Sequence, residues 1–388
     1  MITAINNKHK KLNVPNIRFP EFSGEWNEEC LSDIADIHKG AGISKDQLSD
    51  EGESCILYGE LYTKYKSETI KEVISKTNID NTKLVRSKAN DVIIPCSGET
   101  AEDIATARCV LNDNILLGGD LNIIRLHGYD GSFISYQLNG KRKYDIAKVA
   151  QGVSVVHLYG EHLKGVKTVN PCLEEQQKIS KLLQLLDERI STQTKIIEDL
   201  KKLESALSKK LLSNDNWKIY KIQDIAEIGR GRVISSVEIE RQKHHQYPVY
   251  SSQTSNDGIM GYLDEYMFDG EYITWTTDGA NAGTVFYRNG KFNCTNVCGT
   301  LKIKSNFDCH FVSLVLQQAT QSYVSSNLAN PKLMNNTMAT IKIRIPDRKT
   351  QEQLSKVFKT LENCLLVHQR TCEKYQIEKQ YLLCQMFI

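Results

Sequence analysis

The chain has 388 residues, 40% hydrophobic and 25% charged, which is enough for two or three domains with cores of their own. A formal net charge of +2 argues against a protein that wraps DNA unaided, although it allows base contacts where partners bind the phosphates. No apolar run approaches the length of a membrane span, the first eleven residues lack a signal peptide's apolar stretch, and eleven scattered cysteines favour reduced thiols in a cytoplasm.

Two similar stretches open the two halves of the chain. After a tail at residues 1–15 that we expect to be mobile, residues 32–44 read SDIADIHKGAGIS, and residues 223–235 read QDIAEIGRGRVIS. In this alignment Trp26 matches Trp217, and Lys39 matches Arg230. Each copy predicts a helical turn or strand start that leads into a basic loop containing glycine.

A long amphipathic helix is predicted from Pro171 to Asn214, about 48 Å from the first to the last seam residue, and again at residues 346–388. Apolar residues recur with a mean period of 3.5 and form one seam along each helix. The first seam is Ile179, Leu183, Leu186, Ile190, Ile197, Leu200, Leu207 and Leu211; the second is Leu354, Phe358, Leu361, Leu365, Cys372, Tyr375, Leu382 and Met386. Polar residues interrupt both seams at matching places, Gln193 with His368 and Glu204 with Lys379, which leaves the register of a coiled coil open.

The segments between these helices mix both kinds of structure. Short β-rich runs occur at Asp91–Pro95, Leu121–Leu126, Tyr272–Trp275 and Thr300–Ile303, and helices are plausible at residues 134–150 and 311–328. The fold class is therefore α+β, a tandem repeat with pseudo-two-fold symmetry. The expected domains are globular segments at 16–170 and 215–345, each followed by a helical spacer, at 171–214 and 346–388.

Motifs for catalysis are absent from the sequence. There is no phosphate-binding P-loop, no dinucleotide-binding glycine motif, no nucleophile elbow and no H-E-x-x-H. Cys294, Cys298, Cys309 and His310 make a zinc site conceivable, but their spacing lacks the regular paired form. We expect neither a catalytic residue nor a metal site in this chain.

Polar and basic loop residues are the candidates for contact with DNA. Asn and Gln can bind adenine in the major groove, and Arg and Lys can bind guanine or phosphate, although each residue alone also suits a solvated turn. The candidates are Lys39, Lys45, Arg108, Gln151, Ser154 and His157 in the first segment, and Arg230, Arg232, Ser252, Gln253, Thr254, Asn256, Thr277, Asn281, Lys332 and Asn335 in the second. His157 matches Lys332 in the repeat, as Lys39 matches Arg230.

The ordered combination of motifs resembles the specificity subunits of type I restriction–modification systems. It consists of the NIRFPEF stretch at residues 16–22, the W…DIA(D/E)I…(K/R)G opening of both segments, and Pro171 followed by EQQKI at residues 175–179. The resemblance covers almost the whole chain. The second helix departs from the pattern with TQEQ at residues 350–353, which leaves its local contacts open.

The resemblance implies two target recognition domains separated by an antiparallel pair of coiled-coil helices. Each domain would read one half of a bipartite, asymmetric site in double-stranded DNA. Two methyltransferase subunits would bind the chain and would be joined by restriction subunits that translocate DNA, in the bacterial cytoplasm. S-adenosylmethionine, ATP and Mg would then belong to these partners, and this chain would not be an enzyme. Two alternatives stay open: a stand-alone coiled-coil scaffold, and a methyltransferase or nuclease in its own right.

Overall fold

The computed structural model describes residues 13–80, 83–152, 155–253, 255–325 and 330–388. The chain forms two compact units. The first runs through Thr194 and also includes Gln369–Ile388, and the second is Lys195–His368. Each unit therefore combines one globular segment with part of each long helix. The unit boundaries lie inside the helices because the helix ends pack into the globular cores.

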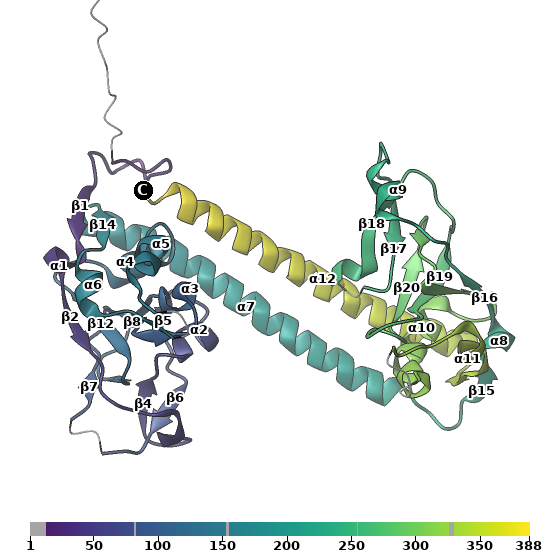
Figure 1. Ribbon diagram of the computed structural model, residues 1–388. Helices are drawn as coiled ribbons and strands as arrows, with labels where there is room; N and C mark the ends of the chain where they lie inside the picture. Colours follow the sequence, from purple (N-terminus) through teal and green to yellow (C-terminus); the bar gives the residue numbers. More distant parts are fainter. Residues whose placement is uncertain (1–12, 81–82, 153–154, 254, 326–329) are drawn as a thin grey trace, which may run out of the picture. The chain divides into compact units, whose positions relative to one another are not determined.

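The first unit is an α+β body built on short strands (Figure 1). Its strands are β1 (Asn27–Cys30), β2 (Ala35–Lys39), β3 (Leu48–Ser49), β4 (Glu53–Ile56), β5 (Thr69–Ile70), β6 (Ser75–Thr77), β7 (Val85–Arg86), β8 (Asp91–Pro95), β9 (Ser97–Gly98), β10 (Arg108–Val110), β11 (Leu116–Leu117), β12 (Leu121–Leu126), β13 (Val156–His157) and β14 (Lys167–Asn170). Its short helices are α1 (Leu31–Ile34), η1 (Lys45–Gln47), α2 (Glu60–Thr63), α3 (Ala101–Ile104), α4 (Gly131–Asn139), α5 (Lys143–Val149) and α6 (Gly160–Lys164).

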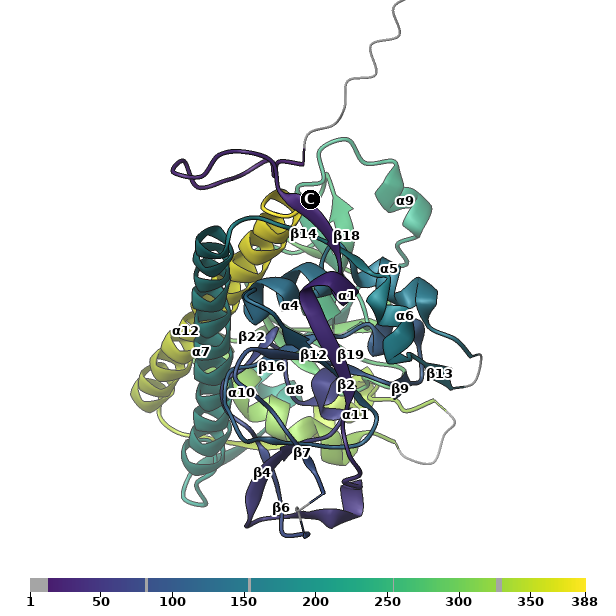
Figure 2. The same cartoon turned by 90° about the vertical axis from the view of Figure 1, so that its left-hand side faces the viewer.

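Two main sheets organise the first unit. One has the order β2-β12-β8-β10-β5, with β12 antiparallel to both neighbours, and the other has the order β3-β6-β4-β11-β7. The pairs β1-β14 and β9-β13 complete the pairing. Figure 2 faces this unit, with β2 and β12 in front. Strand β8 is buried along its whole length, so the DVIIP run is a central strand covered on both faces.

The second unit repeats this plan with fewer strands. Its elements are β15 (Lys218–Lys221), α8 (Ile222–Ile225), β16 (Ala226–Arg230), α9 (Ser236–Glu240), β17 (Tyr247–Tyr250), the turn η2 (Ser255–Gly258), β18 (Ile259–Leu263), β19 (Glu271–Thr276), β20 (Val285–Asn289), β21 (Asn293–Cys294), β22 (Cys298–Ile303), α10 (Cys309–Ala319), η3 (Thr320–Tyr323), α11 (Asn335–Thr340) and β23 (Lys342–Ile345). The sheets are β16-β22-β19-β20, β18-β17-β21 and β15-β23. They correspond to β2-β12-β8-β10, β6-β4-β11 and β1-β14 of the first unit.

One expected helix is wrong in its extent. Residues 134–150 form two helices, α4 and α5, because α4 ends at Gly140, whose N–H caps the Tyr136 carbonyl and whose backbone is not helical. In the second unit the helix expected at residues 311–328 is observed as α10, followed by η3. Residues 326–328 of the expected helix lie outside the described part of the chain. The four expected β-rich runs all lie in strands, namely β8, β12, β19 and β22.

The repeat seen in the sequence extends to side-chain packing. Trp26 meets Phe133 edge-on, with ring centroids 5.7 Å apart and an interplanar angle of 65°. Trp217 meets Phe311 with centroids 5.8 Å apart and the same angle. Each aromatic pair lies in the main core of its unit, so the matched tryptophans anchor the same contact in both cores.

A matched glutamine joins each long helix to its globular segment. The Gln176 side chain donates to the carbonyl of the proline that opens its helix (2.8 Å) and accepts from the Asp130 N–H (2.9 Å). Gln351 makes the same two bonds in the second unit, at 2.9 Å each, with Asp308 in place of Asp130. The two aspartates cap α4 and α10. The same polar junction therefore fixes where each long helix begins.

The long helices are α7 (Leu173–Leu211) and α12 (Arg348–Gln385). None of their seam residues is exposed, but the seam has two uses. Near the start of α7, Ile179 and Leu183 are buried in the globular core of the first unit, and Phe358 near the start of α12 is buried in that of the second. In the middle of α7 the seam residues from Ile190 to Leu207 are half-buried, as expected for residues covered by one neighbouring helix. In the middle of α12, by contrast, Leu361, Leu365 and Cys372 are buried.

In the first unit the two helices run antiparallel. Lys379 Nζ of α12 lies 2.6 Å from Asp187 Oδ1 of α7, and the Cys372 thiol lies 3.9 Å from the hydroxyl of Thr194. Residue numbers therefore rise along α7 in the direction in which they fall along α12. Lys379, an interruption of the seam in the sequence, is only 10% exposed and also binds Glu68 of the globular segment. This buried ion cluster selects one register where the seam alone allows several.

Among the described residues, the helices of this protein include none that is both long and apolar enough to cross a membrane.

Candidate nucleic-acid interface

The repeated basic loops place a lysine and an arginine at the ends of equivalent edge strands. Lys39 ends β2 and Arg230 ends β16, each followed by a glycine. A Cβ on Gly40 would lie 2.0 Å from the Gly118 carbonyl oxygen, and one on Gly231 would lie 2.1 Å from that of Cys294. No side chain fits at such distances. Glycine is therefore required at both positions, and it presses the basic loop against the neighbouring strand connection.

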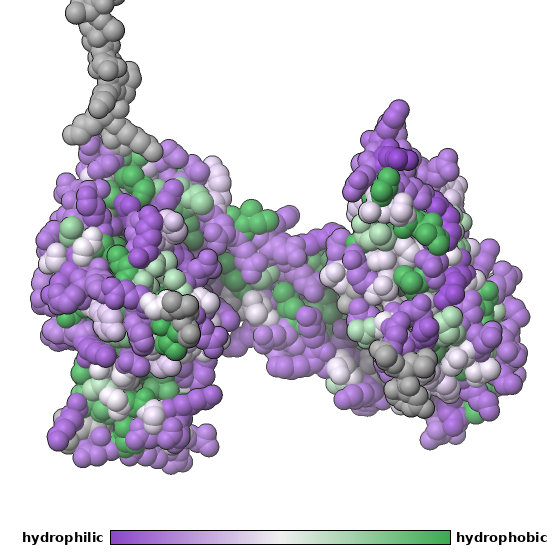
Figure 3. Space-filling view, viewed as in Figure 1, coloured by the Kyte–Doolittle hydropathy of each residue, from purple (hydrophilic) through white to green (hydrophobic). Residues whose placement is uncertain are grey.

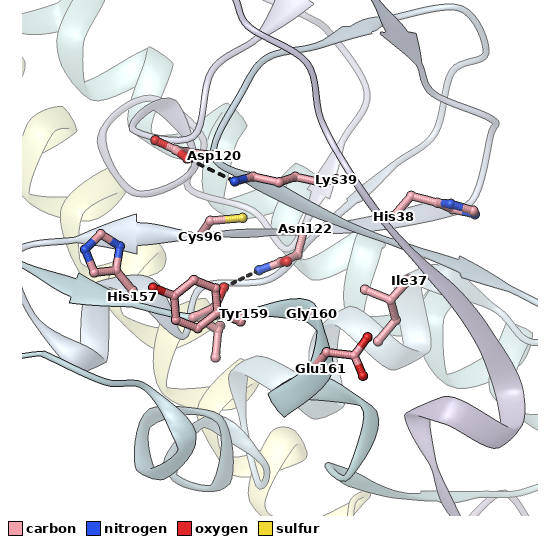
Figure 4. A pocket seen from close by; sticks show the side chains of 11 residues that line it. Ile37, His38, Lys39, Cys96, Asp120, Asn122, His157, Tyr159, Gly160 and Glu161 are labelled. Carbon is pink, nitrogen blue, oxygen red and sulfur yellow. Dashed lines mark hydrogen bonds and ion pairs between the residues drawn. The ribbon is translucent and has the colours of Figure 1, made fainter.

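In the first unit this loop borders a surface cleft (Figure 4). The cavity has a volume of about 220 Å³, and Lys39, Asp120, Asn122, His157 and Tyr159 are among its lining residues. Lys39 Nζ lies 3.8 Å from Asp120 Oδ1, and both side chains are largely exposed. An exposed ion pair of this kind contributes little to stability, so Lys39 and Asp120 can each leave the other and bind a polar group of a ligand instead.

Of the residues predicted in the first segment, Lys39 and His157 line this cleft. Gln151 lies beside His157, because the backbones of the two residues bond to each other at 2.8 and 2.7 Å. Lys45 is exposed in η1, shortly after the basic loop. Ser154, also predicted, lies outside the described residues.

Arg108 was predicted to contact DNA, but the structure buries it. The residue is 8% exposed, and its guanidinium donates to the Tyr65 carbonyl at 3.0 Å and to the Ala107 carbonyl at 2.9 Å. Burial lowers its pKa, against the influence of Glu68. The side chain binds the backbone of its own unit and has no face left for a base.

In the second unit Arg230 lies at the corresponding place. Its guanidinium donates to the Thr277 hydroxyl (3.0 Å), which itself donates to the Val297 carbonyl (3.0 Å). Thr277 was predicted as a DNA contact, but it is fully buried, and its hydroxyl accepts the hydrogen bond from Arg230. The Asn335 amide donates to the Gly229 carbonyl (3.3 Å), and the half-buried Lys332 pairs with Asp278 through the backbone.

The predicted residues of the polar loop after β17 differ in how far their side chains are available to a ligand. Asn256 is exposed, and Thr254 lies outside the described residues. The Gln253 amide donates to the Ile259 carbonyl, and the Asn281 amide donates to the Ser252 carbonyl at 3.3 Å. Gln253 and Asn281 were expected to bind bases, whereas their amide N–H groups here bond to the loop backbone.

Arg232 lies just beyond the basic loop and pairs with Glu238 of α9. The hydrogen bond between the two side chains raises the pKa of Arg232 and lowers that of Glu238. The pair is partly exposed, so Arg232 can exchange this carboxylate for a phosphate at small cost.

Sequence reasoning missed the other residues of the cleft. Asp120 lies between β11 and β12, Asn122 lies in β12, and Tyr159 precedes α6; no local motif marks these positions. The single available signal was the repeat itself, because the chain between β11 and β12 corresponds to the chain between β21 and β22.

The four zinc candidates of the second unit do not form a metal site. Cys294, Cys298 and Cys309 are buried, and burial raises the pKa of each thiol. The His310 ring bonds to the Ser355 hydroxyl (3.0 Å) and the Glu362 carboxylate (3.1 Å). Over the part of the chain that the structure describes, no group of three or more His, Cys, Asp or Glu side chains could hold a metal ion.

Comparison with known proteins agrees with the duplication of the chain. The family model described as the type I restriction modification DNA specificity domain matches residues 23–202 and, a second time, residues 214–379. A solved structure titled as the S subunit of a type I restriction–modification system from M. genitalium shares the fold, with a TM-score of 0.75 and 18% identity over 97% of this chain and 99% of that one.

Curated relatives from Mycoplasma pneumoniae match parts of the chain. A putative type I specificity subunit is 36% identical over 203 residues, which are 50% of this chain and 79% of the relative. The type I restriction enzyme MpnII specificity subunit is 41% identical over 151 residues, 39% of this chain and 45% of the relative. Since the family model matches twice and covers most of the sequence, the chain belongs to the type I restriction–modification DNA specificity family.

Proposed function

We propose that this chain is the DNA-reading subunit of a type I restriction–modification complex, and that each unit reads one half of a bipartite, asymmetric target in double-stranded DNA. The observation that carries the proposal is the duplicated basic loop, with Lys39 and Arg230 each held by a glycine that admits no side chain. Two copies of one reading architecture with different loop residues are what an asymmetric bipartite target requires. The family membership supports the same assignment.

The reading chemistry follows from the side chains that stay exposed around these loops. Lys39, Gln151 and His157 in the first unit, and Arg230 and Asn256 in the second, offer donors and acceptors of the types that distinguish base pairs in the major groove. Phosphate contacts would come in large part from partner subunits, because the chain has a net charge of +2.

Two methyltransferase subunits would dock along the long helices. These helices carry exposed hydrophobic side chains, among them Leu185, Leu203, Leu366, Ile377 and Tyr381, and hydrophobic residues are visible along the helical part of the surface in Figure 3. Exposed apolar groups on a helix outside its seam favour contact with another protein. Restriction subunits would join through the methyltransferases.

Catalysis would belong to those partners. S-adenosylmethionine, ATP and Mg would bind to them, since this sequence has no phosphate-binding or nucleotide-binding motif. The chain itself would be non-catalytic and would determine which adenines are methylated.

The proposal is tested by expressing the full chain with a methyltransferase subunit of such a system and mapping methylated adenines in the host genome. We expect one bipartite sequence with a constant gap. Methylation without any sequence preference would refute the reading role and favour a scaffold. S-adenosylmethionine binding to the isolated chain, measured by calorimetry, would instead favour an enzyme in its own right.

A further inference from the structure

The turn after β17 has an unusual backbone. Asn256 (φ 49°, ψ 42°), Asp257 (φ 54°, ψ 25°) and Gly258 (φ 81°) are three consecutive residues in the left-handed region. Asn and Asp tolerate this region better than other residues with a side chain, but it still costs free energy. Such a conformation persists where surrounding contacts determine it, and it is concentrated at functional sites.

A buried arginine supplies those contacts. Arg288 of β20 is 4% exposed, and its guanidinium donates to the Asp257 carboxylate at 2.7 Å and to the Asp257 carbonyl at 2.8 Å. The guanidinium also lies over two rings, 3.6 Å from the centre of Tyr250 and 4.4 Å from that of Phe286. The aromatic contacts fix the position of the cation, so its two bonds to Asp257 impose a position on the turn.

Asp257 itself is mostly exposed, at 66%. The buried cation of Arg288 therefore pairs with an exposed carboxylate on a surface turn. An ion pair that only stabilised the core could have both partners buried. Stability alone does not explain this arrangement, because a buried charge is often replaceable by apolar residues without loss of stability. Specifying one conformation of the turn does explain it.

We propose that Arg288 is a positioning residue for sequence recognition, which holds residues 255–258 in the conformation that presents Asn256 to DNA. The proposal rests on the proposed reading function of the second unit. Arg288 does not touch DNA in this view. It acts through Asp257 and determines the direction in which the exposed Asn256 side chain points.

The first unit uses an analogous contact. Arg108 lies on β10, the strand that corresponds to β20, and its guanidinium binds the Tyr65 carbonyl in the connection after β4, the strand that corresponds to β17. The two arginines are not at matching positions in the repeat. Both units nevertheless hold the equivalent connection from the equivalent strand with a buried guanidinium.

The test uses the full chain with its methyltransferase subunit and genome-wide mapping of methylated adenines. Arg288→Lys keeps the charge but loses the two-pronged contact, and Asp257→Asn removes the carboxylate charge while keeping a side chain of the same size. Asp257→Glu is the conservative variant. Arg344→Lys is the control, because it alters another ion pair of the same unit, between Arg344 of β23 and Asp215, which precedes β15. The half-site read by the second unit is identified by exchanging residues 216–345 for those of another family member.

We expect Arg288→Lys and Asp257→Asn to raise methylation about tenfold at sites that carry one mismatch in the second unit's half-site, since one mismatched base pair normally costs about 1–3 kcal/mol. The other half-site and the gap should not change, although Arg288→Lys and Asp257→Asn should lower the melting temperature because they weaken the pairing of a buried charge. Asp257→Glu and Arg344→Lys should keep the original motif.

Two results would overturn the proposal. One is an unchanged motif in both Arg288→Lys and Asp257→Asn. The other is equal relaxation of both half-sites. Failure of the proposed function is distinguishable from either, because the unaltered chain would then direct no sequence-specific methylation.

Discussion

Replacing Lys379 by methionine should destabilise the first unit by about 3 kcal/mol, the lower end of the range for breaking a buried ion pair. Lys379 is 10% exposed, and the side chains of Asp187 and Glu68 are 10% and 12% exposed. Methionine has a similar length but no charge, so two carboxylates would remain near one another with little solvent. Asp187 keeps hydroxyl donors from Tyr136 (2.7 Å) and Ser67 (2.8 Å), which is why we expect the lower end.

The assay is denaturant unfolding of the full chain, followed by a probe in the first unit. The matched control is Lys71→Met, which breaks an ion pair with Glu188 in the same unit, where the two side chains are 72% and 55% exposed. An exposed pair of this kind contributes at most about 1 kcal/mol. A loss no larger for Lys379→Met than for Lys71→Met would show that the buried cluster does not hold α12 to the first unit.

The same cluster predicts a dependence on pH. Burial lowers the pKa of Lys379, but the charges of Glu68 and Asp187 outweigh it, and the pKa is raised above its ordinary value. A raised lysine pKa stabilises the fold fully below the unfolded pKa of about 10.4, and the stabilisation is lost as the pH rises through the folded pKa. The difference between Lys379→Met and the unaltered chain should therefore be constant from pH 7 to 9 and should shrink above about pH 10.4.

Three further predictions concern the duplicated architecture. Gly40→Ala and Gly231→Ala should each lower the free energy of unfolding by about 1–3 kcal/mol, because the added Cβ would collide with the backbone. Gly42→Ala is the control and should be neutral or slightly stabilising, because no atom lies within 4 Å of its Cβ. Equal effects at all three positions would contradict the close approach of the backbone at Gly40 and Gly231. Exchanging residues 216–345 for those of another family member should change one half-site in the methylation map, and a change in both would reject independent reading. Deleting seven residues from each of α7 and α12 keeps the seam and should shorten the gap between half-sites by about three base pairs, since about 10 Å of helix is removed; an unchanged gap would show that the helices do not set the spacing.

The sequence by itself determined the features that depend on regular spacing. The period of 3.5 identified α7 and α12, because an apolar seam is a property of neighbours three and four residues apart. The alignment of the two opening stretches paired Trp26 with Trp217, and the structure gives each of these residues an edge-on contact with a phenylalanine. The strands DVIIP and LNIIRL could also be predicted from the sequence, because a short buried strand is a local run of apolar residues.

Which polar residues stay available to a ligand was decided by the tertiary structure. Arg108, Thr277, Gln253 and Asn281 have the residue types of base-reading side chains, yet each bonds to its own unit. The hydrogen-bond partners of Arg108, Thr277 and Asn281 lie 20 to 43 residues away in the sequence. Arg108 also donates to the carbonyl of the preceding residue.

Lys379 is the extreme case, because it meets Glu68 across 311 residues of chain. In the sequence it is a polar interruption of an apolar seam; in the folded unit it is the cation of a buried cluster. The strength of a hydrogen bond or ion pair depends on distance and burial in space, and neither can be read from the order of residues along the chain.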